Sequence, residues 1–480
     1  MICHRRIHPC VPTCKDCTPG SLAALNADGA PGQTSSERDD NLAQIASIAQ
    51  RSGLHRIQAV AWRDLDDPEA GGSEYHAHRV LSLWAGAGVD VRLRTSNATG
   101  RPVMVNRDGY VVTRRSGRYG VFPSTIASAL APRGRPWDGL VEIWNGMPFF
   151  SPLWNPGPRI VFLHHVHAEM WNMVLPTPLA QIGRWMERDL APRIYRGTTI
   201  VTLSESSRDE IINLMGLNPS QVLVVPPGID SRFFPHPRCS EDPLVLAVGR
   251  LVPVKQFDLL IDALAALKRR HPRLQAMIVG EGYLRDELKS RIAHHRAGEW
   301  LNLPGRLDEA SLLEAYQRAW VLASASAREG WGMTITEAAA CATPAVVTRT
   351  VGHIDSVADG ITGIVVDSPA ELAAGLDALI SSEILRSKMG AAARQRALKL
   401  SWEATALRTL KLLAAQCKRA GTAAPQPCLP RQSDESADSP LQGGCRSWSI
   451  GQLAEGFAPD PGDPNLDQNV SREEASREPG

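Results

Sequence analysis

The segment EGWGMTITE carries a glutamate at each end, Glu329 and Glu337. Thr334 and Glu337 have the T-x-x-E spacing of a capping box, which predicts a helix that begins near Thr334 and gives Glu337 a structural role. That motif leaves Glu329 unexplained. A carboxylate in a glycine-flanked loop beside a helix N-terminus can accept hydrogen bonds from ligand hydroxyls while backbone N–H groups bind a phosphate. The segment therefore indicates a site for a ligand that carries both kinds of group.

A pair of cations, Arg250 and Lys255, lies in the segment VGRLVPVK, directly after the apolar run LVLAV. At a strand-to-helix turn such a pair can neutralise a diphosphate, the arginine through bidentate hydrogen bonds. A solvated surface pair would have the same spacing, so both interpretations stay open.

Two glycines, Gly71 and Gly72, follow the first predicted strand and open a helix. A glycine pair lets the backbone approach a ligand closely, and a helix N-terminus favours a phosphate, although such a pair can also serve the turn alone. The segment does not match the G-x-G-x-x-G dinucleotide fingerprint, and the next strand ends in Thr95 rather than in an acid. A nicotinamide-dependent enzyme is therefore disfavoured.

Three histidines, His164, His165 and His167, follow another predicted strand at its C-terminal end, where open α/β sheets bind ligands. The H-H-x-H pattern could ligate a metal. On an extended segment, however, only His165 and His167 share a face, and the sequence places no carboxylate ligand obviously beside them. A polar contact from one histidine to a bound sugar or phosphate is favoured, with a purely structural role as the alternative.

These groups need a scaffold that brings them together. Short β-branched runs alternate with helical spacing in residues 54–228, and the alternation resumes in residues 241–400. This is typical of βαβ units with buried parallel strands. The predicted strands read IQAV, VDVRL, YVVT, RIVFL, TTIVTL and then LVLAV, QAMIV, WLNL, WVLAS, PAVV. We predict an α/β protein with two tandem Rossmann-like, doubly wound domains, a linker over 229–240 and a C-terminal helix over 401–418.

The composition agrees with a protein of two or three domains: 480 residues, 43% apolar and 21% charged. A net charge of +1 gives no sign of a nucleic-acid partner. The sequence has neither an apolar run of the ~20 residues that span a bilayer nor the apolar core of a secretory signal. We therefore expect a cytoplasmic protein.

The two ends of the chain are polar and lack periodicity, so we expect a disordered arm over 1–53 and a disordered acidic tail over 419–480. The arm contains four cysteines, Cys3, Cys10, Cys14 and Cys17. Their spacing fits no familiar zinc pattern, so a metal site there is disfavoured.

Several long segments, in order, resemble one family: VGRLVPVKQFDLLIDALAAL, MIVGEGYLRDELK, LPGRLDEASLLEAYQRAWVLASAS and EGWGMTITEAAACATPAVVT. They resemble the retaining glycosyltransferases of family 4, which have the GT-B fold of two Rossmann-like domains facing a cleft. The resemblance spans about residues 55–415, is stronger in the second domain, and extends to FLHHVHAEMW in the first. It implies a hexosyltransferase that moves a sugar from a GDP- or UDP-linked donor to an acceptor hydroxyl with retention of configuration, without a metal or other cofactor.

The resemblance implies a role for each matching residue. Glu329 would bind hydroxyls of the donor sugar, and Glu337 would bind the nucleotide ribose. Arg250 and Lys255 would neutralise the diphosphate, whose charge grows as it departs. The remaining implied donor contacts are Gly71, Gly72, Gly330, Gly332, Met333 and Thr334. His164 best matches the active-site histidine, with His165 and His167 as alternatives.

The family pattern is not matched everywhere. Its paired glycine and glutamate after the E-x7-E helix are replaced in VGHIDSV by Val351 and Asp355, and Ala342 stands where glycine is common. These departures concern loop geometry, and with it the preference for a donor.

Nine arginines and a single acid, Asp108, lie between Arg92 and Arg135. This concentration of positive charge suggests a phosphorylated acceptor or contact with an anionic membrane. The nearby segment LAQIGRWMERDL could be an interfacial helix or an amphipathic helix packed on its own sheet. Its apolar positions are Leu179, Ile182, Met186 and Leu190, flanked by Arg184 and Arg188.

Two other functions remain open. A nucleotide-sugar epimerase could share the two-domain architecture, but it would need acid and base residues for proton transfer at the sugar ring. A non-catalytic sensor of nucleotide sugars would bind the donor without turnover.

Overall fold

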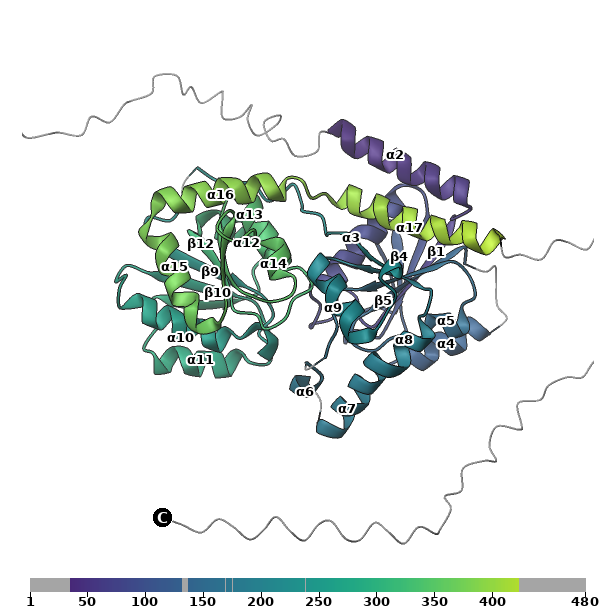
Figure 1. The fold of residues 1–480 in the computed structure, drawn as a ribbon, viewed down its shortest axis with the longest axis horizontal. Helices are drawn as coiled ribbons and strands as arrows, with labels where there is room; N and C mark the ends of the chain where they lie inside the picture. The colour runs from purple at the N-terminus through teal and green to yellow at the C-terminus, as the bar shows by residue number, and fades with distance from the viewer. Residues whose placement is uncertain (1–34, 132–136, 169, 175, 238, 423–480) are drawn as a thin grey trace, which may run out of the picture. The chain divides into compact units, whose positions relative to one another are not determined.

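The computed structural model describes residues 35–131, 137–168, 170–174, 176–237 and 239–422 (Figure 1). Among these residues it contains two β-sheets connected by helices, as the alternating pattern predicts. The predicted arm over residues 1–34, with its cysteines, and the predicted tail after residue 422 lie outside the described residues.

The first sheet has the strand order β3-β4-β2-β1-β5-β6-β7-β8 in the part of the chain that the structure describes. Neighbouring strands are parallel except for the antiparallel hairpin of β3 and β4. The strands are β1 (Arg56–Ala61), β2 (Asp90–Thr95), β3 (Met104–Arg107), β4 (Tyr110–Arg114), β5 (Gly139–Trp144), β6 (Arg159–Leu163), β7 (Thr199–Thr202) and β8 (Val222–Val224). The central strand β5 is buried along its whole length, as expected for a parallel sheet covered on both faces.

Helices and short helical turns connect these strands. They are α3 (Gly72–Gly86), α4 (Val121–Leu130), α5 (Ser151–Trp154), α6 (Met170–Val174), α7 (Thr177–Trp185), the π-helix η1 (Met186–Leu190), α8 (Ala191–Ile194), α9 (Glu205–Met215) and the 3-10 turn η2 (Pro219–Gln221).

The second sheet is parallel throughout, with the order β11-β10-β9-β12-β13-β14 among the described residues. Its strands are β9 (Leu244–Val248), β10 (Gln275–Val279), β11 (Leu301–Gly305), β12 (Val321–Ser324), β13 (Ala345–Thr348) and β14 (Gly363–Val366). Its helical elements are η3 (Pro253–Lys255), α10 (Phe257–Lys268), α11 (Arg285–His294), α12 (Glu309–Arg318), α13 (Met333–Ala340), α14 (His353–Ser356), η4 (Pro369–Glu371), α15 (Leu372–Ser381) and α16 (Glu383–Ala397).

Two helices from opposite ends of the described chain, α2 (Ser35–Ser52) and α17 (Trp402–Thr422), lie side by side on the first sheet (Figure 1). The prediction of disorder is therefore wrong for residues 35–52. The apolar stripe of Leu42, Ile45 and Ala49 has helical spacing and packs into the same core as Trp402. In the sequence this short stripe is hidden within a polar segment.

Candidate active site

Strand order reverses at one position in each sheet, between β1 and β5 in the first and between β9 and β12 in the second. Doubly wound sheets bind ligands beyond the carboxyl ends of the strands at such a switch point. Gly71 and Gly72 follow β1, His164 follows β6, Arg250 follows β9, and Glu329 follows β12. The predicted site residues therefore occupy the edges at which binding is expected.

Glu329 forms an ion pair with Lys255, which lies in the turn η3 after β9. Ser326 Oγ donates a second hydrogen bond to Glu329 Oε1 over 2.8 Å. Burial would raise the pKa of Glu329, but Lys255 and His353 lower it below its ordinary value. The site thus holds an ionised carboxylate and an ammonium group in contact.

At Gly330, the loop after Glu329 is packed too closely against the first domain to carry a side chain. A Cβ atom at Gly330 would lie 2.6 Å from the carbonyl oxygen of His164. The carbonyl of Gly330 accepts hydrogen bonds from the hydroxyls of Ser204 and Ser207, over 3.1 and 3.2 Å. Gly332 has φ +88°, the left-handed conformation that favours glycine, and caps helix α13.

The predicted capping box of Thr334 and Glu337 is wrong. Helix α13 begins at Met333 with Gly332 as its N-cap. The Glu337 carboxylate instead accepts a hydrogen bond from the Tyr316 hydroxyl over 2.6 Å. Burial raises the pKa of Glu337, although Tyr316 opposes this effect. Tertiary packing against α12 has replaced the local motif.

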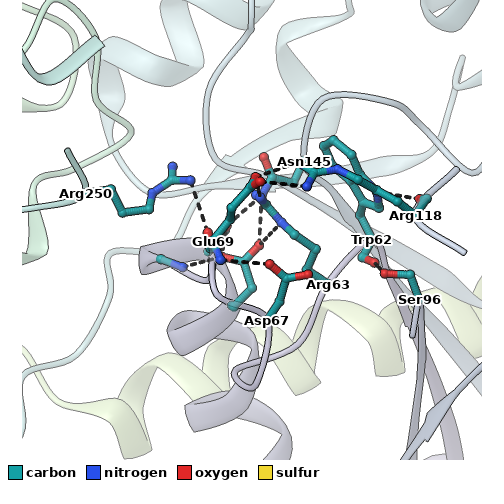
Figure 2. Close-up of polar contacts among 11 residues, drawn as sticks. Trp62, Arg63, Asp67, Glu69, Ser96, Arg118, Asn145 and Arg250 are labelled. Atoms are coloured by element: carbon teal, nitrogen blue, oxygen red, sulfur yellow. Dashed lines mark hydrogen bonds and ion pairs between the residues drawn. The ribbon is translucent and has the colours of Figure 1, made fainter. Parts of the chain in front are cut away.

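Gly71 and Gly72 lie against residues of the second domain. A Cβ at Gly71 would come within 3.1 Å of Arg250 Nε, and a Cβ at Gly72 within 3.0 Å of the Met333 methyl group. Arg250 Nη1 also donates to the backbone carbonyl of Glu69 over 3.1 Å (Figure 2). The structure thus brings together the predicted residues Gly71, Gly72, Arg250 and Met333.

Three polar residues that the sequence analysis missed meet at the N-terminus of α3: Glu74 of the helix itself, and Arg63 and Asn145 from the loops after β1 and β5. Glu74 Oε2 accepts a hydrogen bond from Gly71 N over 2.8 Å, and Glu74 Oε1 lies 3.5 Å from Arg63 Nε. Asn145 Nδ2 donates to Glu74 Oε1 over 3.0 Å. Burial would raise the pKa of Glu74, but Arg63 and the Gly71 N–H lower it overall. Arg63 and Asn145 could have been found in the sequence by their position, because they lie within two residues of the ends of β1 and β5.

The three histidines do not lie in one environment. His164 Nε2 lies 3.2 Å from His76 Nδ1 in a buried pair, and burial lowers the pKa of His164 to about 4. His165 and His167 stack with ring centroids 5.1 Å apart, as their predicted common face requires. Burial, together with the positive charges of Arg63, Arg328 and Arg250, lowers the pKa of His167 to about 4. At neutral pH His164 and His167 are therefore neutral hydrogen-bonding groups.

A buried carboxylate, that of Glu187, holds the histidine loop. It accepts hydrogen bonds from His167 N over 2.8 Å, Ala168 N over 2.9 Å and Trp171 Nε1 over 3.2 Å. Burial raises the pKa of Glu187 despite these donors. Glu187 belongs to the π-helix η1, a rare element that is frequent at functional sites.

In the arginine-rich stretch between residues 92 and 135, four of the nine arginines are paired with acids that lie outside the stretch. Arg107 and Arg114 form ion pairs with Asp64 and Asp66, and the Arg114 side chain is 1% exposed. Other pairs join Arg92 to Asp90 and Arg118 to Glu69. The expected concentration of unpaired positive charge is therefore reduced by acids that the sequence places elsewhere.

Among the described residues, no group of three or more histidine, cysteine or acidic side chains is placed to bind a metal ion. Within the same residues, no helix has the length and apolar character needed to cross a bilayer.

Comparison with known proteins identifies the fold. Sucrose-phosphate synthase of Thermosynechococcus elongatus superposes with a TM-score of 0.65 at 18% identity, covering 77% of this chain and 100% of that one. HepE of Anabaena, solved with UDP-glucose, superposes with a TM-score of 0.58 at 16% identity, with coverages of 77% and 100%. The predicted GT-B architecture, with two Rossmann-like sheets, is confirmed. The chain therefore belongs, by its fold, to the class of two-domain GT-B proteins.

The sequence comparisons identify the family. The model of glycosyltransferase family 4 matches residues 70–233, and that of glycosyl transferases group 1 matches residues 229–396. The D-inositol 3-phosphate glycosyltransferase of Kineococcus radiotolerans is 31% identical over 422 residues, covering 76% of this chain and 95% of that protein. Its counterpart in Thermobifida fusca is 32% identical over 400 residues, covering 73% and 91%. The chain belongs to the family 4 glycosyltransferases and is an enzyme of that kind.

Proposed function

We propose that the enzyme transfers a hexose from a UDP- or GDP-linked donor to an acceptor hydroxyl with retention of anomeric configuration. The observation that carries this proposal is the Lys255–Glu329 ion pair, which lies at the same switch point as Arg250. Arg250 in turn lies against Gly71. Arg250 and Lys255 would bind the diphosphate, and Glu329 would bind sugar hydroxyls. Gly330, Gly332, Met333 and Thr334 would line the donor, with Glu337 near the ribose.

In the proposed reaction the bond from the sugar C1 to the diphosphate oxygen breaks, and a bond from C1 to the acceptor oxygen forms. The acceptor proton leaves with the nucleoside diphosphate. Negative charge grows on the departing diphosphate, and fixed cations stabilise it more in the transition state than in the ground state. Arg250 and Lys255 supply this charge, so we propose a reaction without a metal or other cofactor.

We propose further that the acceptor carries a phosphate group. The relatives named above are called D-inositol 3-phosphate glycosyltransferases and cover most of this chain. Two arginines in the loops after β1 and β4, Arg63 and Arg118, donate hydrogen bonds to Glu69, two residues before Gly71. They offer a place for an anionic group beside the donor.

The test is turnover with a panel of nucleotide sugars, preceded by thermal-shift screening, because a ligand bound only by the native state raises the unfolding temperature. Replacement Glu329→Gln should remove most transfer while the variant still unfolds cooperatively. Glu314→Gln, at an exposed position on α12, is the control and should retain full activity. A donor whose sugar changes configuration without acceptor would indicate an epimerase. A thermal shift without any wild-type turnover would indicate a sensor.

We also propose that helix α7 contacts an anionic membrane surface. The side chains of Leu179, Ile182 and Trp185 are 52–55% exposed, while the buried face consists of the small residues Ala180 and Gly183. The first part of the apolar face thus points away from the protein, whereas its other two apolar positions, Met186 and Leu190, are half-buried. Tryptophan and leucine beside arginine are typical of interfacial helices.

Co-sedimentation with vesicles tests the membrane contact. Wild type should bind vesicles that contain anionic lipid, and Trp185→Ser or Arg184→Gln with Arg188→Gln should weaken this binding. Ile384→Ser, which removes an apolar side chain 84% exposed on α16, should leave it unchanged. Equal sedimentation of wild type with neutral and anionic vesicles, or of all variants, would contradict the proposal.

A further inference from the structure

The carboxylate of Glu69 is bound by two guanidinium groups beside the candidate donor site (Figure 2). Arg118 Nη1 and Nη2 donate to Glu69 Oε1 and Oε2 over 2.6 and 2.5 Å, and Arg63 Nη1 donates to Oε2 over 2.9 Å. The side chains of Glu69 and Arg118 are 46% and 43% exposed, whereas that of Arg63 is 5% exposed. A carboxylate that solvent can reach therefore covers a buried cation.

The two arginines are oriented by groups other than Glu69. The Cζ atoms of Arg63 and Arg118 lie 4.9 and 5.0 Å from the ring centroid of Trp62, at cation–π distance. Trp62 Nε1 donates to the Arg118 carbonyl over 2.6 Å, and Arg63 also contacts the buried Glu74. Loss of the Glu69 side chain would thus leave both guanidinium groups in place.

The backbone of Glu69 is also held independently of its side chain. Its N–H donates to Asp67 Oδ1 over 2.8 Å, and its carbonyl accepts a hydrogen bond from Arg250 Nη1 over 3.1 Å (Figure 2). The hydrogen bond from Arg118 lowers the pKa of the Glu69 carboxyl, so the group is an anion at neutral pH. The side chain can rotate out of the site while the loop keeps its contact with Arg250.

The neighbouring acids of the same loop differ in exposure. Asp64 has a side chain only 1% exposed, and it forms ion pairs with Arg107 and Arg114 in the protein interior. Glu69 is half exposed and adjacent to the cation that we assign to the donor diphosphate. An anionic group of the acceptor could therefore occupy the position of the Glu69 carboxylate.

We propose that Arg63 and Arg118 bind a phosphomonoester of the acceptor and that the Glu69 carboxylate occupies this site until the acceptor displaces it. The proposal rests on the proposed transfer function and names the residues that select the acceptor. The planar guanidinium fork binds phosphate and carboxylate with the same bidentate geometry. A bound phosphate would repel the Glu69 carboxylate, so the two occupants exclude each other.

Calorimetric titration with inorganic phosphate and with D-inositol 3-phosphate tests this arrangement. Glu69→Gln removes the competing charge and should tighten binding of both probes by about tenfold, whereas Arg118→Gln should weaken it by about tenfold. Combining the two replacements should abolish the gain. Arg92→Gln, which changes an exposed arginine paired with Asp90, is the matched control and should leave binding unchanged.

Unchanged or weaker phosphate binding by Glu69→Gln would overturn the proposal, because it would show that the Glu69–Arg118 pair is only structural. A second experiment measures binding to vesicles that contain phosphatidic acid. Selective binding to these vesicles would show that the phosphate group belongs to a lipid headgroup rather than to a soluble acceptor. Phosphate titration needs no turnover, and UDP or GDP titration of the same variants monitors the donor site. A failure of the transfer function is thereby distinguished from a failure of this site.

Discussion

At the scale of single residues, the structure separates the three histidines by the groups around them. The ring of His164 lies against His76 and Phe162 in the interior of the first domain. The pKa of His167 is lowered by burial and by the positive charges of Arg63, Arg328 and Arg250. His165 and His167 therefore both lie close to the cations of the proposed donor site, because, besides burial, Arg328 and Arg250 lower the pKa of each. His167 also lies against Gly146, which directly follows Asn145. We propose His167, rather than His164, as the donor-facing residue.

Replacing each of these histidines by asparagine tests the assignment. We expect His167→Asn to lower kcat by roughly 10²–10³, the usual effect of removing one positioned hydrogen-bonding group from a transition state. His164→Asn should mainly lower the unfolding temperature and leave kcat within about tenfold of wild type. Steady-state kinetics with thermal unfolding of both variants provides the measurement. A large loss of kcat in His164→Asn, with little change in His167→Asn, would identify His164 as the donor-facing histidine.

The buried pair of His76 and His164 predicts a loss of stability in mild acid. Burial lowers the pKa of His164 to about 4, against an opposing effect of Glu74, and lowers that of His76 well below 6.5. In the unfolded chain both histidines bind a proton near pH 6.5, so below that pH the unfolded state binds more protons. Their contribution to stability is therefore complete above pH 6.5 and is lost as the pH falls towards 4.

Urea unfolding at pH 7.0 and 5.5 measures this effect. The free energy of unfolding should fall by about 2–3 kcal/mol over this interval because of the two histidines. Other buried histidines such as His167 add to the total fall, so His76→Asn should make the measured fall smaller by about 1 kcal/mol. The exposed His55 provides a control in His55→Asn. An identical pH dependence in wild type and His76→Asn would contradict the expectation.

At the scale of elements, local patterns predict the strands better than the helix ends. The runs RIVFL, LVLAV and QAMIV coincide with β6, β9 and β10. Strand β5, GLVEIW, is absent from the prediction because Glu142 interrupts its apolar run. The structure satisfies this carboxylate with Tyr195 Oη over 2.6 Å and Phe149 N over 2.7 Å. Phe149 is seven residues from Glu142 in the chain, but Tyr195 is 53 residues away, so the sequence does not show that these donors meet the carboxylate.

The site was predictable where a single loop carries its own signal. Glycine pairs and cations after a strand indicate Gly71, Gly72 and Arg250 without any knowledge of sheet order. Arg63 and Asn145 instead act together because β1 and β5 are neighbours, although about 80 residues separate them in the chain. Their importance follows from topology rather than from spacing.

Ala342, at a position where the family commonly has glycine, provides a test at the end of helix α13. Its φ is +61°, a left-handed conformation that costs an L-residue about 1–2 kcal/mol. Ala342→Gly should remove this cost and stabilise the protein by about 0.5–1 kcal/mol after the larger chain entropy of glycine is included. Ala265→Gly, within helix α10, should instead destabilise by about 1 kcal/mol. Chemical denaturation measures the free energy of unfolding of both variants. Equal destabilisation of the two would contradict the prediction.

At the scale of the whole molecule, the two segments that join the domains touch each other. Ile229 forms a parallel bridge with Ser401, and Thr405 Oγ1 donates to the Pro226 carbonyl over 2.8 Å. A Cβ atom at Gly228 would overlap the backbone of Trp402. These contacts place both connections at one point, where relative motion of the domains would be concentrated.

Gly228→Ala tests this close approach. The added methyl group meets backbone atoms that no side-chain rotation can relieve, so we expect a loss of about 2 kcal/mol or more in unfolding free energy. Gly86→Ala, at the end of helix α3 with open space around it, should be neutral or slightly stabilising. Differential scanning calorimetry of the two variants gives the comparison, and a neutral Gly228→Ala would show that the two segments can separate at little cost.

Helix α17 has a consequence for synthesis on the ribosome. Trp402, Leu410 and Leu413 belong to the core built by β1 and α3, yet they emerge after the whole second domain has been translated. At roughly 5–20 residues per second, the nascent first half waits about ten to forty seconds for the helix that completes it. During that interval the first half exposes apolar surface that the helix later buries. We therefore expect chaperones to bind the N-terminal half of the nascent chain more than the second domain, whose core consists of its own residues.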